Sequence, residues 1–329
     1  MNRIKYFFKE NYKSIIFLIL FSLVCFYPLP YYIDSPGGLI NLNNRIVIQD
    51  KKINGSYSLT YVSEYRATLP ILLFSWLKGD SEIFKKDDVM GKNETDKEYL
   101  KRDYLSYKSS LSNAVIAAYN LAGKKIDISN NYLYVGYIFD DSITDLKIGD
   151  EIVSIDNVSV STKKEINELL NTKNDKDRIS IKVINNEKEY ERYAVINNLE
   201  GNNYIGFLPI EIYDYKVSPK INIKESRSEY GGSGGLMVSL MIYDMLISKD
   251  LSNGRKIAGT GTIDINGNVG EIGGIEFKVA AASKAKADVF FVPVDNYKDA
   301  IKYAKKKKYK LNIVKVNTLI DAVNYLKSK

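Results

Sequence analysis

One serine lies in a setting that could make it a nucleophile. Ser233 is the centre of the sequence GGSGG at residues 231–235, which leads directly into the apolar run LMVSLMIYDMLI. The first N–H groups of a helix have no partner within the helix and carry the positive end of its dipole. A serine at that point can attack a carbonyl while these N–H groups stabilise the oxyanion. The pattern therefore favours a catalytic serine at a helix start.

Other interpretations of the GGSGG segment fit the sequence less well. A flexible linker rarely runs straight into a dozen apolar residues, and the lysine of a phosphate-binding loop is missing after the glycine. The segment also matches the G-x-S-x-G elbow of α/β-hydrolases, but that enzyme class needs a histidine. The chain contains no histidine, so this interpretation is rejected.

A serine without histidine needs another base, and lysine serves in Ser-Lys enzymes. A lysine can act so only if its pKa falls from about 10.4 towards neutrality. Burial in apolar surroundings lowers a lysine pKa because it penalises the charged form. Lys278 is the best candidate, because the small apolar residues Val279–Ala282 that follow it predict a buried helix. Taken alone, a lysine at a helix start is more often a surface residue.

The two segments together resemble the Lon-type protease domain. The serine motif of that family is G-P-S-A-G, and its lysine motif is G-x-V-x-P-I-G-G-[LI]-x-x-K-x-x-A-A. Residues 267–282 read GNVGEIGGIEFKVAAA, and the flanking AGTGTI and DVFFVP also fit. The resemblance implies that Ser233 is the nucleophile, that Lys278 is the general base and that the backbone of Gly232, Ser233 and Gly234 forms the oxyanion hole.

Three departures from the family pattern concern the candidate site. Gly232 replaces the usual proline and Gly234 the usual alanine, which loosens the turn. Asp264 stands where the family has a threonine that hydrogen-bonds the lysine. Thr260, Thr262 and Asp264 share one face of an expected strand, so a hydroxyl could still reach Lys278, and we take these three as supporting residues.

The composition excludes several other kinds of chemistry. Without histidine there is no histidine-ligated metal site, and the single cysteine, Cys25, cannot form an internal disulfide. We expect no metal and no cofactor, since EF-hand and Walker motifs are absent. The net charge of +7 lies largely in the two ends of the chain. No nucleic-acid-binding motif accompanies it, so we expect no nucleic-acid partner.

An apolar segment near the N-terminus predicts a membrane anchor. Residues 14–33 (SIIFLILFSLVCFYPLPYYI) carry no charge, follow four basic residues and precede Asp34. About twenty apolar residues span a bilayer, and the flanking charges place the N-terminus in the cytoplasm. The alternative is a cleaved signal peptide, but no small-x-small cleavage site follows. We expect a single-pass protein of the cell membrane with an extracellular catalytic part.

A separate small unit is expected between residues 129 and 199. A strand-like segment at 132–139 is followed by LKIGDEIVSIDNVSV, a short amphipathic helix at 163–170 and an alternating strand at 178–184. This order resembles a PDZ domain, which binds an extended peptide at a sheet edge. The resemblance implies that Val135, Gly136, Tyr137 and Ile138 line the peptide groove. The alternative is a structural domain with a filled groove.

The order of segments is similar to the membrane-bound PDZ-Lon proteases of Gram-positive bacteria. YYIDSPGG after the apolar segment and SLSNAVIAAYNLAG before the small unit also resemble that family. The second of these is similar to the helix that opens the Lon catalytic domain, so we expect the PDZ-like unit to be inserted into that domain.

We therefore predict an α+β multidomain chain with one transmembrane helix, a PDZ-like β-barrel domain and a Lon-type proteolytic domain. The expected parts are a cytoplasmic tail at 1–13, a transmembrane helix at 14–33, the first part of the catalytic domain at 35–128, the PDZ-like domain at 129–199 and the protease domain at 200–329.

The predicted function is ATP-independent serine endopeptidase activity on exported peptides or membrane-proximal proteins. The alternatives are an inactive, membrane-tethered peptide-binding scaffold and a hydrolase of non-peptide esters. Peptide or protein substrates are the expected partners, and the resemblance leaves a homo-oligomer open.

Overall fold

The computed structural model describes residues 2–49, 51–225 and 230–329. The chain forms two compact units, one of residues 1–36 and 62–89 and the other of residues 37–61 and 90–329. Both contain helices and strands, which agrees with the predicted α+β class.

The first unit differs from the expected anchor. Its helix α1 (Asn2–Phe26) ends at Phe26, and residues 31–33 belong to the following strand, β1 (Tyr31–Asn41). Pro28 and Pro30 separate the two elements, since neither residue can donate a helical hydrogen bond. In the described parts of the chain, every helix is too short or too polar for a bilayer span. The remaining elements of this unit are α2 (Leu69–Lys78), β4 (Glu82–Lys85) and α3 (Lys86–Val89).

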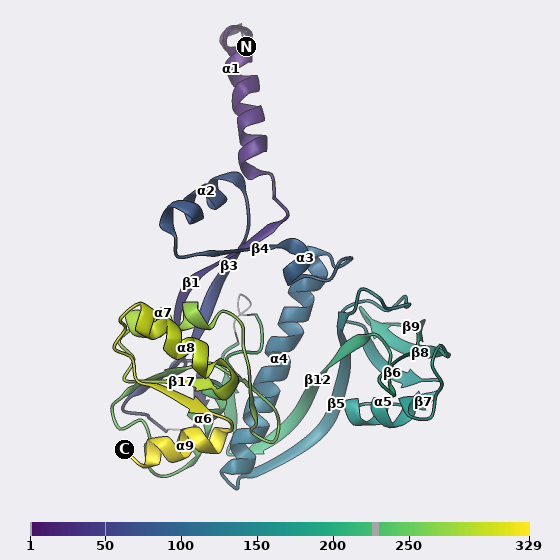
Figure 1. The fold of residues 1–329 in the computed structure, drawn as a ribbon, viewed down its shortest axis with the longest axis vertical. Coiled ribbons are helices and arrows are strands. Elements are labelled where there is room, and N and C mark those ends of the chain that lie inside the picture. The colour runs from purple at the N-terminus through teal and green to yellow at the C-terminus, as the bar shows by residue number, and fades with distance from the viewer. Residues whose placement is uncertain (1, 50, 226–229) are drawn as a thin grey trace. The chain divides into compact units, whose positions relative to one another are not determined.

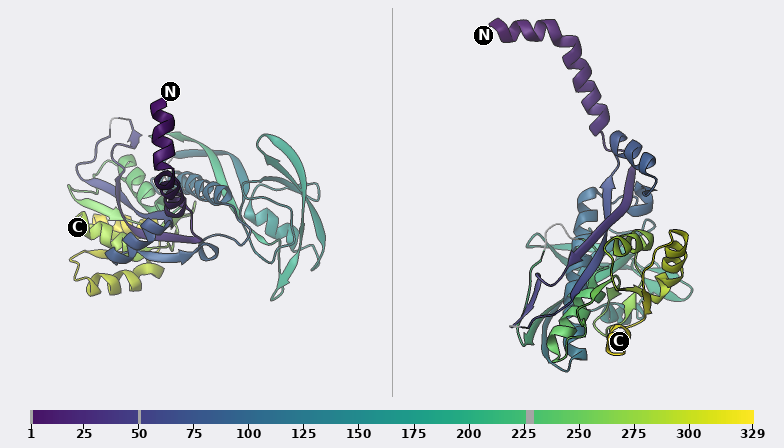
Figure 2. Two further views of the ribbon diagram at one scale, coloured as in Figure 1. Left: turned by 90° about the horizontal axis from the view of Figure 1, so that it is seen from above. Right: turned by 90° about the vertical axis from the view of Figure 1, so that its left-hand side faces the viewer.

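Strands β1 and β3 (Ser56–Arg66) are long neighbours in the same sheet (Figure 2). β1 includes residues 34–38, although proline and glycine usually favour a turn. The glycines there serve close packing instead. A Cβ atom on Gly37 would lie 2.3 Å from the carbonyl oxygen of Tyr61 in β3. Only glycine allows so close an approach.

The centre of the larger unit is a parallel sheet with helices on both faces (Figure 1). Strand β14 (Lys256–Gly259) pairs in parallel with β3 and with β17 (Val289–Pro293), and β17 pairs in parallel with β18 (Ile313–Val316). Side chains alternate between the faces of a strand. Phe291 accordingly packs with α6 (Gly235–Leu246) and α9 (Leu319–Lys327), whereas Phe290 packs with α7 (Ile275–Lys284) and α8 (Val294–Lys306).

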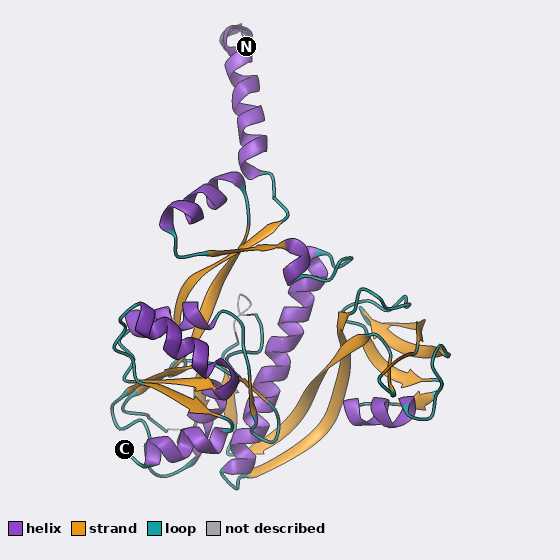
Figure 3. Cartoon of the chain, viewed as in Figure 1, coloured by secondary structure: helices purple, strands orange, loops and turns teal. Residues whose placement is uncertain are grey.

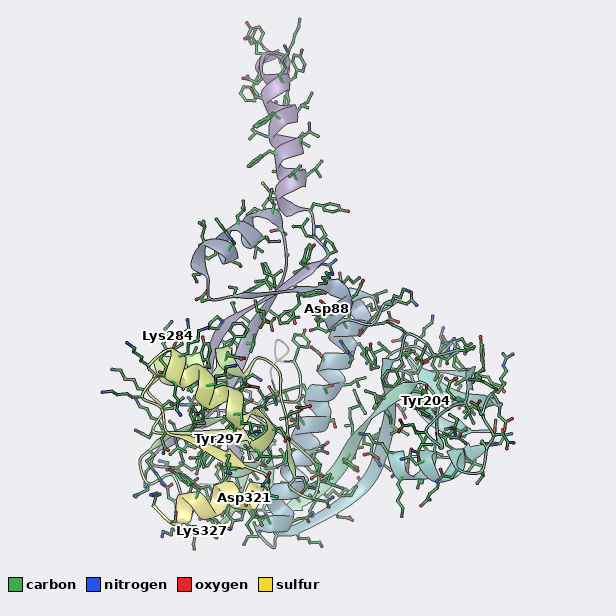
Figure 4. The ribbon with its side chains drawn as sticks, viewed as in Figure 1. Asp88, Tyr204, Lys284, Tyr297, Asp321 and Lys327 are labelled. Carbon is green, nitrogen blue, oxygen red and sulfur yellow. The ribbon has the colours of Figure 1, made fainter. Side chains whose placement is uncertain are left out.

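Two helices dominate the first face of this sheet. α6 is buried along its whole length, as expected for a helix that is apolar on all sides. α4 (Asp96–Leu121) packs against it through Ala114–Ala118 and begins with a capping box, in which Thr95 and Glu98 bond each other's backbone N–H groups. At the start of α9, the carboxylate of Asp321 (labelled in Figure 4) similarly accepts hydrogen bonds from two backbone N–H groups.

A second hydrophobic core belongs to the small domain. Figure 3 draws this domain as strands with one helix. Its sheet has the order β12-β5-β6-β8-β9. The strands are β5 (Lys125–Ile138), β6 (Glu151–Ile155), β7 (Val158–Ser159), β8 (Arg178–Asn185), β9 (Lys188–Val195) and β12 (Phe207–Ser218), with α5 (Lys163–Leu170) as the helix. The remaining short strands of the chain form two-stranded sheets apart from this one. They are β2 (Ile46–Ile48), β10 (Asn197–Leu199), β11 (Asn202–Tyr204), β13 (Ile221–Ile223), β15 (Thr262–Ile263) and β16 (Val269–Gly270).

β5 and β12 form one long antiparallel ribbon, with register shifts at Leu208/Pro209 and Asp214/Tyr215. One end of the ribbon contributes Leu133, Val135 and Phe207 to the small core. The other end packs Ile126 and Val217 against the larger core.

Candidate active site

Ser233 lies at the start of a buried helix. It precedes α6 by two residues, Gly234 is the N-cap, and the Ser233 side chain is half-buried. Gly231 adopts a φ of 79°, a left-handed conformation that favours glycine. The sequence prediction of a serine at a helix N-terminus agrees with this placement.

The end of β14 holds the turn around Ser233, which we call the nucleophile turn (residues 231–235). The N–H of Gly261 donates to the Ser233 carbonyl at 2.8 Å, and the Thr260 hydroxyl donates to the same oxygen at 3.1 Å. The N–H of Leu236 returns a bond to the Gly261 carbonyl at 3.1 Å. These bonds fix the backbone on both sides of the serine.

The same turn presents unsatisfied donors. Considering the described residues alone, the N–H groups of Gly232, Ser233 and Gly234 have no hydrogen-bond acceptor. They lie at the positive end of the α6 dipole, where an anion is stabilised. These are the donors that the family resemblance implies for an oxyanion hole.

α4 holds the other side of the nucleophile turn. The N–H of Gly231 donates to the Asp103 carbonyl at 3.0 Å, and the Ser110 hydroxyl donates to the Gly232 carbonyl at 2.8 Å. Sequence reasoning missed Ser110, because 122 residues separate it from Gly232 and no local pattern marks it. It lies in the segment that resembles the opening helix of the Lon domain, which is the only signal that pointed there.

Lys278 is buried in α7, as the apolar residues after it predicted. It is the fourth residue of the helix, its N–H donates to the Gly274 carbonyl, and it is 4% exposed. Its neighbours Ile275 and Val279 pack in one core with Ala258 of β14.

The two candidate catalytic residues converge on one strand. Gly261, directly after β14, binds Ser233, while Ala258 within β14 packs against the helix of Lys278. α6 and α7 lie on opposite faces of the sheet, and the serine and the lysine occupy the first turn of each helix or the residues before it. In sheets of parallel strands this carboxyl edge is where ligands commonly bind.

The three expected supporting residues have different surroundings. Thr260 is fully buried and binds the Ser233 carbonyl. Thr262 pairs with Gly270, and its methyl group would lie 3.8 Å from a Cβ on Gly232. Asp264 instead orders the β15–β16 turn, since its carboxylate accepts from Asn266 and from the backbone and side chain of Asn268. Nowhere in the described chain do His, Cys, Asp and Glu group as a metal site would require.

The structure places the four expected groove residues in β5, away from a free sheet edge. β12 pairs with one edge of this strand, and the backbone of Val135 bonds residues 149 and 150 on the other. Val135 belongs to the small core, and a Cβ on Gly136 would lie 2.6 Å from Ile210. The expected groove at these residues is therefore corrected, because the chain's own strand occupies the edge.

The edge strand on the β5 side of this sheet is β12, while β9 forms the opposite edge. β12 ends the strand order, and Leu208 at its start is 52% exposed. The N–H of Lys163, at the start of α5, donates to Glu211 of β12 at 2.8 Å. The edge beside α5 is thus the place where a strand could be added to the small domain.

Residues 226–327 match the family model of the Lon protease (S16) C-terminal proteolytic domain. This segment contains both Ser233 and Lys278. It is similar to a Lon-type proteolytic domain. A "Lon protease" of Aster yellows witches'-broom phytoplasma is 31% identical over 91 residues, which cover 28% of this chain and 11% of that protein. A "Lon protease" of Campylobacter jejuni is 28% identical over 121 residues, 33% of this chain and 15% of that protein.

The chain thus matches only a small part of these relatives' length. Two solved PDZ domains of SdrC-like proteins are also similar. The one from Listeria monocytogenes is 20% identical and covers 26% of this chain and 93% of that chain, with a TM-score of 0.23. The one from Listeria innocua is 26% identical and covers 24% and 92%, with a TM-score of 0.22. At such scores the likeness assigns no function to the small domain.

Proposed function

We propose that this chain is an ATP-independent serine endopeptidase with a Ser233–Lys278 dyad. The proposal rests on a serine in a turn whose N–H groups have no acceptor among the described residues, and on a 4% exposed lysine in the first turn of α7. The Lon-type domain that contains both residues supports it.

In the proposed reaction the Ser233 oxygen attacks the peptide carbonyl while Lys278, in its neutral form, accepts the hydroxyl proton. The N–H groups of residues 232–234 stabilise the oxyanion of the tetrahedral intermediate. Lys278 then donates its proton to the leaving amine. A water molecule, activated by the lysine, hydrolyses the acyl-enzyme.

We propose that the small domain is inserted into the catalytic domain and presents the substrate. The larger core contains residues from 42–57, 114–119 and 236–326, while the second core contains residues from 133–207. By analogy with PDZ domains, an extended peptide would add to β12 between Phe207 and Ile212, beside α5. Main-chain bonds at such an edge accept many sequences.

We also propose that the catalytic part works outside the cytoplasm. The basic residues before the apolar segment 14–33 and Asp34 after it support this location. The test is digestion of a C-terminal tag by added protease in intact cells. A tag that is cleaved only after lysis would contradict the proposal.

The activity is tested with the full chain in detergent, offered an unfolded protein without ATP or metal from pH 6 to 9. We expect cleavage that rises with pH, because Lys278 acts in its neutral form. Both Ser233→Ala and Lys278→Ala should abolish it. Cleavage at the wild-type rate in either variant would refute the dyad. Binding of peptide without cleavage by the wild-type chain would support the scaffold function.

A further inference from the structure

The start of α4 is attached to the small domain through a stacked arginine. The guanidinium carbon of Arg102 lies 5.2 Å from the ring centre of Tyr137 in β5 and 5.0 Å from that of Tyr99. Its Nε lies 3.1 Å from a carboxylate oxygen of Glu94, whose side chain is 2% exposed. A cation stacked on rings and paired with a buried carboxylate is held in one orientation.

Further contacts join the same segment to the small domain. The N–H of Lys92 donates to the Asp140 carboxylate at 2.8 Å. The Lys101 side chain packs on Gly149, where an added Cβ would lie 2.9 Å from the lysine Cε. The attachment therefore involves the residues before α4 as well as its second turn.

The residue after Arg102 contacts the nucleophile turn. The Asp103 carbonyl accepts from the N–H of Gly231, and the Ser110 hydroxyl donates to the Gly232 carbonyl. Ser110 also packs closely against the first residue of α6, since a Cβ on Gly235 would lie 2.6 Å from its hydroxyl oxygen. One continuous helix thus contacts the small domain and both residues that precede Ser233.

We infer that Ser110 is a positioning residue for Ser233, and that the contact of Arg102 with Tyr137 sets its position, so that α4 couples the small domain to the nucleophile turn. The inference rests on the proposed role of Ser233. It extends that role, because the reactivity of the serine then depends on contacts made in another domain.

The geometry explains why a small displacement would matter. A helix rises about 1.5 Å per residue, so Arg102 and Ser110 are about 12 Å apart along α4. A packed helix shifts as a unit, and a misplacement of about 1 Å at a catalytic group can cost about 100-fold in rate. Substitutions at two independent sites this far apart would have additive effects on the activation free energy of labelling, so their rate factors would multiply. Substitutions at coupled sites would not.

The test is a double-mutant cycle in the full chain, read as the second-order rate at which a fluorophosphonate labels Ser233. We expect Ser110→Ala to slow labelling about tenfold, the value of one buried hydrogen bond. Tyr137→Leu should slow it about fivefold, and Tyr137→Phe, which keeps the ring, should restore the wild-type rate. The combination of Ser110→Ala with Tyr137→Leu should be no slower than Ser110→Ala alone.

Ser112→Ala is the matched control. Ser112 is another buried serine of α4, but its hydroxyl donates to the Ser109 carbonyl and accepts from the N–H of Tyr213 in β12, and none of its described hydrogen bonds reaches the turn. This variant should label at the wild-type rate. Asp140→Ala removes the acceptor of the Lys92 N–H and should slow labelling about twofold. Because Asp140 is exposed, this variant replaces Tyr137→Leu in the test if Tyr137→Leu fails to fold.

Each outcome bears on the inference. Losses that multiply in the double variant, or wild-type rates in Tyr137→Leu and Asp140→Ala, would overturn the coupling while leaving the dyad intact. A wild-type rate in Ser110→Ala would overturn its positioning role. A wild-type chain that is not labelled at Ser233 would refute the proposed function itself, and with it this inference.

Discussion

Thr260 acts on the backbone of the serine residue. Its buried hydroxyl donates to the Ser233 carbonyl, which also accepts from the N–H of Gly261. Sequence reasoning grouped Thr260 with residues that could reach Lys278, but this bond assigns it to the nucleophile turn. A carbonyl held by two donors leaves the serine little freedom to rotate about its backbone.

We predict that Thr260→Val lowers the free energy of unfolding by about 1 kcal/mol, the typical value of one hydrogen bond. It should also slow fluorophosphonate labelling of Ser233, because one of the two donors is lost. Thr60→Val is the control, since the buried Thr60 hydroxyl binds the Gly259 carbonyl instead. Equal labelling rates for the two variants would contradict the role of Thr260.

A second residue makes the stability of α6 depend on pH. Asp244 is 3% exposed and accepts from the Tyr57 hydroxyl at 2.6 Å and from the N–H of Leu251 at 2.7 Å. Burial raises the pKa of its carboxyl above the ordinary value, although both hydrogen bonds act against the shift. The folded chain therefore holds this proton to a higher pH than the unfolded chain does.

It follows that ionisation of Asp244 favours the unfolded chain as the pH rises above about 4. We predict that Asp244→Asn gains stability relative to wild type between pH 4 and pH 7, measured by denaturant unfolding.

Asp250→Asn serves as the control, because the stability that ionised Asp250 contributes is lost only as the pH falls below about 4, so this variant should show little trend between pH 4 and pH 7. Burial acts to raise the pKa of Asp250, but hydrogen bonds from Ser252 and Asn54 outweigh it and lower the pKa. The same pH trend in both variants would be inconsistent with these assignments.

At the scale of elements, neighbouring glycines of the nucleophile turn have different requirements. A Cβ on Gly232 would meet its nearest atom at 3.5 Å, which is an ordinary contact, whereas Gly231 has a φ of 79°. We predict that Gly232→Ala raises the free energy of unfolding by about 0.5 kcal/mol, because the unfolded chain loses freedom. Gly231→Ala should lower it by about 1 kcal/mol or more. Thermal unfolding of both variants checks the difference, and a loss of stability in Gly232→Ala would count against it.

The elements that the sequence predicted well are those with complete local signals. The helix expected at 163–170 has those bounds in the structure, where Thr162 and Glu165 form its capping box. α4 begins at Asp96, well before Ser110, where the segment that resembles the opening helix of the Lon domain starts. Its first two turns are mostly charged and show no apolar period, so their helical state depends on the Thr95 cap and on tertiary contacts.

The candidate site divides in the same way. Ser233 and Lys278 were found because each stands beside a local pattern of glycines or small apolar residues. Ser110 and the edge strand β12 were not found, because both depend on which distant segments the fold brings together. No spacing along the chain contains that information.

At the scale of the whole molecule, the two separate hydrophobic cores predict that a cavity made in one core destabilises the domain around that core and not the other. Leu133 belongs to the small core and Leu240 to the larger core, and both are fully buried. Each substitution to alanine should cost about 2–5 kcal/mol. We expect two transitions in calorimetry, with Leu133→Ala lowering one midpoint and Leu240→Ala the other. A single transition that both variants shift equally would show that the cores unfold together.

The β5–β12 ribbon has a consequence for how such a molecule can change. The chain enters the small domain along one strand and leaves along its neighbour, and adjacent strands are about 5 Å apart. For the rest of the chain, the residues between β5 and β12 are therefore equivalent to a loop that joins two strands of a hairpin. A gene segment that encodes another domain with adjacent ends could replace residues 139–206 without altering a strand of the sheet that contains β3, β14, β17 and β18. Such an exchange would keep Tyr137, and with it the stacking contact to Arg102, but would remove the bond between Lys92 and Asp140.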